Sequence, residues 1–236
     1  AFSPVLPGDY QRTSYPVAVF RWQLRNPTNQ PLELSLLLSW RNTVGWFTNT
    51  DASAEVHFRD DGSPEHNYAP AIGRGEGQRN RHHDQPGLTG LLLEGSRSEP
   101  IGEGQGQWCL ALPDDLADAQ VMRCSRWDPS GDGAEIWSSF AADGTVADSN
   151  NDRASCGNEQ AAAALAVKLT LAPGESREIP MVISWDLPVT SFASGVSDRR
   201  RYTDFFGADG DSAAAIAAEA LRDWPQWRQR IEAWQQ

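Results

Sequence analysis

Carboxylate side chains are the most numerous groups in this sequence that could do acid–base chemistry, with 32 Asp and Glu among 236 residues. Two of them can serve as proton donor and nucleophile only when a rigid pocket holds them about 5 Å apart. The clusters here, Asp60–Asp61, Asp114–Asp115 and Asp148–Asp152, stand in polar segments that are typical of solvated loops. We therefore predict no catalytic residue within this chain.

Potential metal ligands occur in two kinds of segment. His82 and His83 with Asp84 offer imidazole and carboxylate groups, but no histidine-rich or cysteine-rich segment stands nearby. The segment 128–135 and the segment 143–152 hold clustered oxygen ligands of the kind that calcium prefers, although their spacing departs from that of an EF-hand loop. The ligands in the first of these are Asp128, Asp132 and Glu135. We expect polar loops, no metal site and no cofactor, with calcium binding in these loops as the alternative.

Tryptophan is the other residue type with a chemical use here, because an indole face can stack on a sugar ring. The sequence has ten tryptophans. Trp22, Trp40 and Trp185 fall on the apolar side of predicted strands, so we expect them in the core, where truncation to alanine costs roughly 3–5 kcal/mol. Trp46 follows Gly45 in a predicted loop. It is our candidate for contact with a substrate.

Composition narrows the class of protein. The net charge of −12 repels phosphate backbones, and the basic side chains form one short run, Arg199–Arg201, so we predict no nucleic-acid partner. No apolar run reaches the roughly 18 residues of a membrane span, and the first residues lack the features of a signal peptide. The odd number of cysteines, at Cys109, Cys124 and Cys156, argues against a disulfide framework. We expect a cytoplasmic location, with peripheral membrane association as the alternative.

Two regions show the two-residue alternation of half-buried strands. Apolar residues alternate over 15–26 and again over 32–40, with a polar turn between them, which predicts a hairpin. The same pattern recurs over 163–171 and 179–185 around the turn 172–176, which predicts a second pair of strands. Pro180 lacks a backbone N–H donor, so its nitrogen must face an edge, a bulge or a gap in the ladder, and we expect an edge strand or a bulge.

Shorter apolar runs lie between these pairs and predict further strands. Many short strands with turns between them favour an antiparallel β-sandwich over a parallel sheet. We therefore predict a mainly β chain, with a supersandwich-like antiparallel β-sandwich and a short α-helical tail. The shorter runs are Glu55 to Arg59, Leu88 to Glu94, Gln107 to Leu112, Gln120 to Ser125 and Ala134 to Phe140.

The pattern changes to a helical one after Asp209. Ser212 can cap an alanine-rich helix, and Pro225 favours the start of a second helix in tandem with it. We expect a sandwich over residues 1–208 and a helical segment over 209–236. The apolar residues of the tail recur every three or four positions and form one stripe. Its later members are Trp224, Trp227, Ile231 and Trp234.

Three blocks of the sequence together resemble glycoside hydrolase family 116, which includes bacterial β-glucosidases and non-lysosomal glucosylceramidases. One opens the chain, one covers two pairs of strand segments, and one joins the last strands to the helical tail. They are Ala1 to Asp9 with Pro16 to Trp22; Leu36 to Asn42 with Pro173 to Glu175 and Ser184 to Pro188; and Arg201 to Gly207 continuing into the helix that ends at Ile231 to Gln235.

The resemblance implies an N-terminal β-sandwich followed by an (α/α)6 catalytic domain that carries both catalytic carboxylates. A glycine-rich segment of the family is missing here, so we expect that the first strands of the sandwich are absent. The implied function is that of an accessory domain of a retaining β-glucosidase or glucosylceramidase, inactive by itself, with the tryptophan stripe of the tail as the interdomain contact. A β-glucoside or glycolipid would bind through the catalytic domain. The alternative is a free-standing carbohydrate-binding module.

Overall fold

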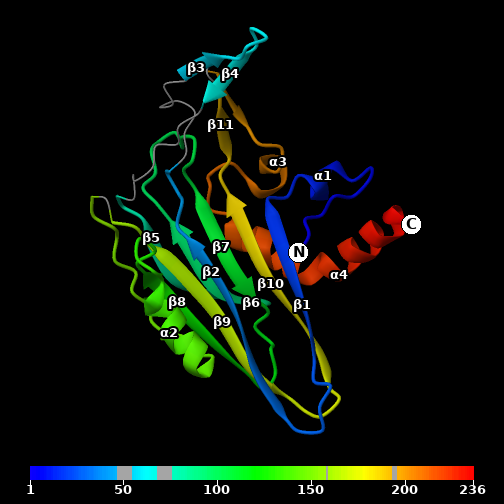
Figure 1. The fold of residues 1–236 in the computed structure, drawn as a ribbon. Helices are drawn as coiled ribbons and strands as arrows, with labels where there is room; N and C mark the ends of the chain where they lie inside the picture. The colour runs from blue at the N-terminus through cyan, green and yellow to red at the C-terminus, as the bar shows by residue number, and fades with distance from the viewer. Residues whose placement is uncertain (47–54, 68–75, 158, 193–195) are drawn as a thin grey trace.

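Two antiparallel sheets lie face to face in the computed structural model, which describes residues 1–46, 55–67, 76–157, 159–192 and 196–236 (Figure 1). The larger sheet has the strand order β1-β10-β7-β6-β5, and the smaller has the order β2-β9-β8. The sequence prediction of a mainly β antiparallel sandwich is confirmed. The strands of the larger sheet are β1 (Val17–Arg25), β5 (Arg79–Gln85), β6 (Leu88–Glu94), β7 (Gln107–Leu112) and β10 (Ser176–Asp186); those of the smaller are β2 (Leu32–Arg41), β8 (Ala119–Trp127) and β9 (Ala162–Leu171).

The core between the sheets is built by alternation along the strands. In β9, Leu165, Val167 and Leu169 face the larger sheet, where Ile179 and Met181 of β10 meet them. These side chains are at most 2% exposed, so each leaves water almost completely. Burying an aliphatic side chain of this size contributes about 1.5–3 kcal/mol, and the dry interior is what holds the two sheets together.

A helix covers the outer face of each sheet, as Figure 1 shows. The long helix α4 (Ala213–Gln235) packs on the larger sheet, where it shares a buried cluster with residues of β1, β6, β7 and β10. The helix α2 (Ala134–Asp143) packs on the smaller sheet through Ile136 and Phe140. Ala164 and Ala166 of β9 lie beneath α2 in the same cluster, and their small side chains let the helix approach the strand closely.

Both predicted strand pairings were wrong, although the strands themselves exist. β1 pairs with β10, and β2 pairs with β9, so neither pair of consecutive strands forms a hairpin. Each turn instead carries the chain from one sheet to the other. Asn26, which is fully buried, joins the two turns: its Nδ2 atom donates to the carbonyl oxygens of Leu171 at 3.0 Å and Ala172 at 3.1 Å. Its own carbonyl accepts from the N–H of Gly174, so the two corners stabilise one another.

Three further local predictions need correction. The segment from Ala134 is a helix rather than a strand, because Gly133 and Gly144 in left-handed conformations bound it and Ile136 and Phe140 share one helical face. Pro225 lies inside the continuous helix α4 and does not begin a second helix. Buried side chains on both sides of Pro225 hold the helix together at the position where it lacks a hydrogen bond.

Pro180 lies within β10, which is an interior strand without a break in its register against β1. The prediction of an edge strand or a bulge was therefore wrong. The pairing of β10 with β7 covers Val182 to Asp186, so Pro180 precedes it, and no strand among the described residues pairs with that side of the backbone. A proline is tolerated there because the sheet needs no donor on that side.

The remaining elements are short and decorate the ends of the sandwich. The hairpin β3–β4 and the hairpin β11–β12 extend from the same end in Figure 1. Two helices have a single turn each. The bounds are β3 (Glu55–Phe58), β4 (Pro64–Asn67), β11 (Val189–Ser191), β12 (Ser197–Arg199), α1 (Tyr10–Thr13) and α3 (Thr203–Phe206).

Candidate functional site

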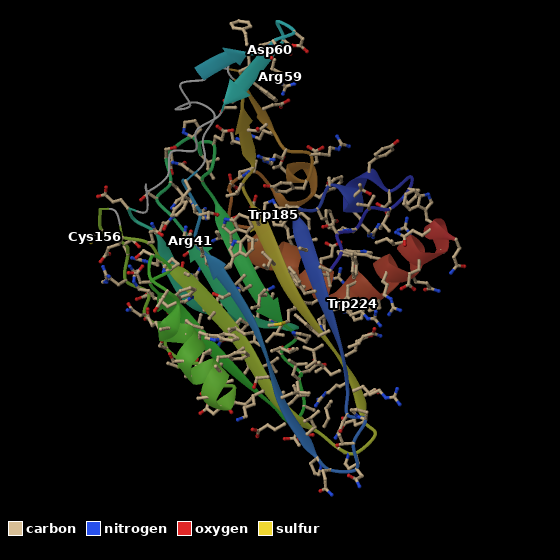
Figure 2. The ribbon with its side chains drawn as sticks, viewed as in Figure 1. Arg41, Arg59, Asp60, Cys156, Trp185 and Trp224 are labelled. Atoms are coloured by element: carbon tan, nitrogen blue, oxygen red, sulfur yellow. The ribbon has the colours of Figure 1, made fainter. Side chains whose placement is uncertain are left out.

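The apolar stripe of α4 divides into a buried and an exposed part. Trp224 is 8% exposed and Trp227 is 1% exposed, because both pack against the chain's own larger sheet. The ring of Trp227 lies edge-on to Tyr15, with 6.2 Å between the ring centroids. Ile231 is half-buried, and Trp234 is 61% exposed. Of the four residues predicted for an interdomain contact, the structure leaves mainly Trp234 accessible; Trp224 is labelled on α4 in Figure 2.

An ion pair fixes the C-terminal half of α4 to the start of the chain. Arg230 lies 2.7 Å from Asp9, whose side chain is 13% exposed. Burial favours the protonated form of Asp9, but the hydrogen bonds from Arg230 and Arg12 outweigh it and lower the pKa below its ordinary value. Asp9 therefore stays charged and also caps α1, accepting from the N–H of Arg12 at 3.1 Å. The exposed end of α4 is thus held in a defined direction.

A buried carboxylate connects the last strand of the sandwich to the helices that follow it. Asp186, at the end of β10, is fully buried and accepts hydrogen bonds from the Tyr202 hydroxyl at 2.9 Å and the Ser212 N–H at 2.8 Å. Ser212 is the residue before the first turn of α4. Burial raises the pKa of Asp186, and burial together with this carboxylate raises the pKa of Tyr202. The sequence blocks that contain these residues gave no sign of this connection.

Three tryptophans from both sheets meet at one end of the core. Trp108 of β7 and Trp185 of β10 are directly opposite in the register, and their ring centroids are 5.3 Å apart with planes inclined by 37°. Trp40 of β2 lies 5.4 Å from Trp108 at 43°. Figure 2 labels Trp185 near the end of β10. We call these three residues the tryptophan row.

The structure corrects the prediction that Trp22, Trp40 and Trp185 lie in the core. Trp40 is 36% exposed, Trp185 is half-buried, and Trp22 on the edge strand β1 is 41% exposed. The alternation correctly placed all three on the inner faces of their sheets, but an inner face is open to solvent at the margin of a sandwich. Trp40, Trp108 and Trp185 each stand within two residues of a strand end. Their positions near the strand ends are the feature of the sequence from which the tryptophan row could have been predicted.

A cavity of about 450 Å³ lies against the tryptophan row. Trp40, Trp108 and Leu187 form its apolar lining. Its polar rim consists of Thr43, Glu103, Thr190 and Arg200. Glu103 is held in place by the Ser191 N–H, which donates to its carboxylate at 2.8 Å. The cavity therefore combines indole surfaces with one carboxylate and one guanidinium.

Trp46, the residue predicted to contact a substrate, is 4% exposed. The guanidinium carbon of Arg41 lies 5.1 Å from the centroid of its ring. Trp46 follows the loop from which Thr43 reaches the cavity, but its own indole face is covered. Contact between Trp46 and a ligand stays a prediction, and the accessible indole in this region is that of Trp40.

The predicted candidates for metal binding make structural contacts instead. The Nε2 atom of His82 lies 3.0 Å and 2.9 Å from the carbonyl oxygens of Arg123 and Ser149. Asp84 forms an ion pair with Arg123 at 2.7 Å, and Asp128 accepts from Ser130 within its own turn. Within the described ranges, no three His, Cys, Asp or Glu side chains gather as a metal ion would require.

These features define a class of protein: a two-sheet antiparallel β-sandwich with a helix on each outer face. The buried carboxylate of Asp186 connects the sandwich to the helices that follow it. A family model described as beta-glucosidase 2, glycosyl-hydrolase family 116 N-term, matches residues 1–227. The chain belongs to this family of N-terminal domains, as the three sequence blocks predicted. Among the residues described, no helix is both long enough and apolar enough to span a membrane.

Proposed function

We propose that this chain acts as an accessory β-sandwich that docks on an (α/α)6 catalytic domain of the same β-glucosidase through the exposed end of α4. The family supports a β-glucosidase as the parent protein. The observation that carries the docking proposal is Trp234, which is 61% exposed on a helix whose apolar face is buried up to Trp227. Tryptophan is among the side chains that contribute most to protein interfaces, so this indole is the candidate contact.

The direction in which α4 points also supports docking through its C-terminal end. Figure 1 shows the C-terminal end of the helix extending past the edge strand β1, away from the sandwich. The Arg230–Asp9 pair fixes this end, and Arg228 adds a contact with Glu178 at 3.9 Å. A partner that covers Trp234 therefore meets a pre-ordered surface, which reduces the entropy cost of binding. In this proposal residues 209–236 form the link between the two domains.

The chain alone is expected to hydrolyse no aryl β-glucoside, since the proposal assigns both catalytic carboxylates to the helical domain. A β-glucoside or glycolipid would be bound there. The three cysteines are unpaired and one of them is exposed, which supports a cytoplasmic location for the parent protein.

The test is the binding of this chain to the helical domain of its own protein, supplied as a separate polypeptide and followed by isothermal titration calorimetry. Trp234→Ala should weaken binding by about 1.4 kcal/mol or more, which is tenfold, and leave the melting temperature of the chain unchanged. Trp137→Ala is the matched control, because Trp137 is 60% exposed but lies on α2. Equal affinities for the two variants would exclude the end of α4 as the docking surface.

The alternative function, a free-standing carbohydrate-binding module, is favoured by a separate observation. Such a module needs accessible indole faces, and the tryptophan row supplies Trp40 next to a cavity. Binding of a sugar without any catalytic domain present would support it.

A further inference from the structure

We infer that the cavity beside the tryptophan row is a binding site for a neutral pyranose sugar, with Trp40 as the indole on which the ring stacks. The inference is independent of the docking proposal, because it concerns the open end of the sandwich and the docking proposal concerns α4. It uses only residues that the structure describes.

The first argument is the placement of aromatic side chains where a core would ordinarily be closed by aliphatic ones. The interior between the sheets is lined by leucine, isoleucine, valine and methionine. At this end it changes to three indoles in contact, with centroid separations of 5.4 Å and 5.3 Å. Trp40, at 36% exposed, keeps part of its surface open to solvent. This exposed part of Trp40 lies beside the cavity, where a bound ligand can cover it.

The second argument is the match between an indole and a pyranose ring. The face of an aromatic ring carries a negative potential that attracts the weakly positive C–H groups on one side of a sugar ring. The hydroxyl groups then point outward around the ring, toward polar partners. A site for a sugar therefore needs an aromatic surface with donors and acceptors at its rim, which is the arrangement around Trp40.

The third argument is the polar rim. The backbone N–H of Ser191 holds Glu103, whose carboxylate can accept hydrogen bonds from hydroxyl groups. Arg200 provides a donor on an exposed side chain. One negative and one positive group leave the rim without net charge, which favours a neutral sugar over an acidic one. Thr43 and Thr190 add hydroxyl groups that both donate and accept.

The fourth argument is the size of the cavity. The volume of about 450 Å³ falls within the roughly 300–1,000 Å³ of small-ligand sites, so we expect one or two sugar rings rather than a long polysaccharide.

The experiment is saturation-transfer difference NMR on the 236-residue chain, with methyl β-glucopyranoside, methyl β-galactopyranoside and cellobiose as probes. We expect saturable binding of at least one probe, in the millimolar range that a single small ligand typically reaches. Trp40→Ala should weaken it roughly five- to hundredfold, which is the usual effect of removing an aromatic stacking surface. Trp22→Ala is the matched control, since Trp22 is 41% exposed and does not line the cavity.

Arg200→Ala provides a second variant that does not disturb the core, because Arg200 is exposed. It should also weaken binding. If circular dichroism shows that Trp40→Ala does not fold, the sugar affinity of Arg200→Ala tests the inference in its place. Absence of saturable binding to every probe would overturn the inference, as would unchanged affinity in Trp40→Ala or in Arg200→Ala. Because no catalytic domain is present in this experiment, neither result bears on docking through Trp234.

Discussion

Removing the Asp186 carboxylate should destabilise the whole chain, since this group connects β10 to Tyr202 and to the start of α4. In Asp186→Ala, the Tyr202 hydroxyl and the Ser212 N–H lose their acceptors, at 2.9 Å and 2.8 Å in the native chain; the Tyr202 hydroxyl is buried and the Ser212 N–H is part-buried. An unsatisfied buried donor costs about 1–3 kcal/mol, so the loss of the Tyr202 contact alone should cost about that much, and the Ser212 N–H should add a smaller amount. Loss of a proper start to α4 acts in the same direction.

Asp186→Asn separates the hydrogen bonds from the charge. An asparagine can accept from the Ser212 N–H through Oδ1 and donate from Nδ2 to the Tyr202 hydroxyl oxygen, so both contacts survive. Burial raises the pKa of Asp186 in the folded chain. The native carboxyl therefore contributes most below its unfolded pKa, and part of that contribution is lost as the pH rises through the folded pKa. Asparagine does not titrate, so the stability of Asp186→Asn relative to the native chain should increase as the pH rises through the folded pKa of Asp186.

Urea unfolding followed by circular dichroism, at several pH values between 3 and 8, measures both effects. Tyr202→Phe is the control, because it removes one of the two donors and should cost about 1–2 kcal/mol. The reasoning would be refuted if Asp186→Ala were as stable as the native chain to within about 0.5 kcal/mol. Equal losses in Asp186→Ala and Asp186→Asn would also refute it, since the hydrogen bonds would then not be the cause.

Two further predictions concern a charged pair and the thiols. Burial favours the protonated form of Glu94, but hydrogen bonds from Arg81 at 3.0 Å and 3.3 Å help to lower the pKa of Glu94 below its ordinary value. The contribution of Glu94 to folding stability is therefore present above its unfolded pKa and is lost as the pH falls through its folded pKa. Glu94→Gln should cost about 1–2 kcal/mol in urea at pH 7 and little at pH 3; a constant difference would contradict this. Burial raises the pKa of Cys109 to about 12, and Cys124 is also buried, whereas Cys156 is exposed. A thiol reagent should therefore label one cysteine in the native chain and three after unfolding, and Cys156→Ser should abolish the native labelling.

The long alternating strands could be read from the sequence, but their partners could not, and β5, whose His82 to Asp84 were expected in a polar loop, was missed. Alternation over 15–26 or 163–171 is a local property of the chain, and it correctly indicated β1 and β9. Whether a short turn returns the chain to the same sheet or sends it across to the other depends on contacts made elsewhere. Here that contact is Asn26, whose acceptors lie at Leu171 and Ala172 in the other corner. A turn rich in Asn and Pro is compatible with either outcome.

The same limit applies to the candidate site. Alternation assigns a side chain to a face of a sheet, but it does not say where along the strand the opposing sheet ends, so Trp40 was expected to be buried. Asp186 closes an apolar strand, where a charged residue ordinarily marks the return to solvent. Its burial depends on Tyr202 and Ser212, which the sequence places 16 and 26 positions away. The family, in contrast, was accessible from short blocks of sequence because their order and spacing span nearly the whole chain.

The pairing of β1 with β10 and of β2 with β9 has a consequence for the folding of the chain during synthesis. Arg21 and Glu178, which meet across β1 and β10, are separated by 157 positions in the sequence. Pairings over such distances require a large loop to close before any contact is gained, and domains dominated by them fold slowly. During synthesis β1 and β2 leave the ribosome long before β9 and β10 exist. The leucine-rich side of β2 then stays uncovered in the growing polypeptide until β9 and β10 have been made, and uncovered apolar surface of this kind is prone to aggregation.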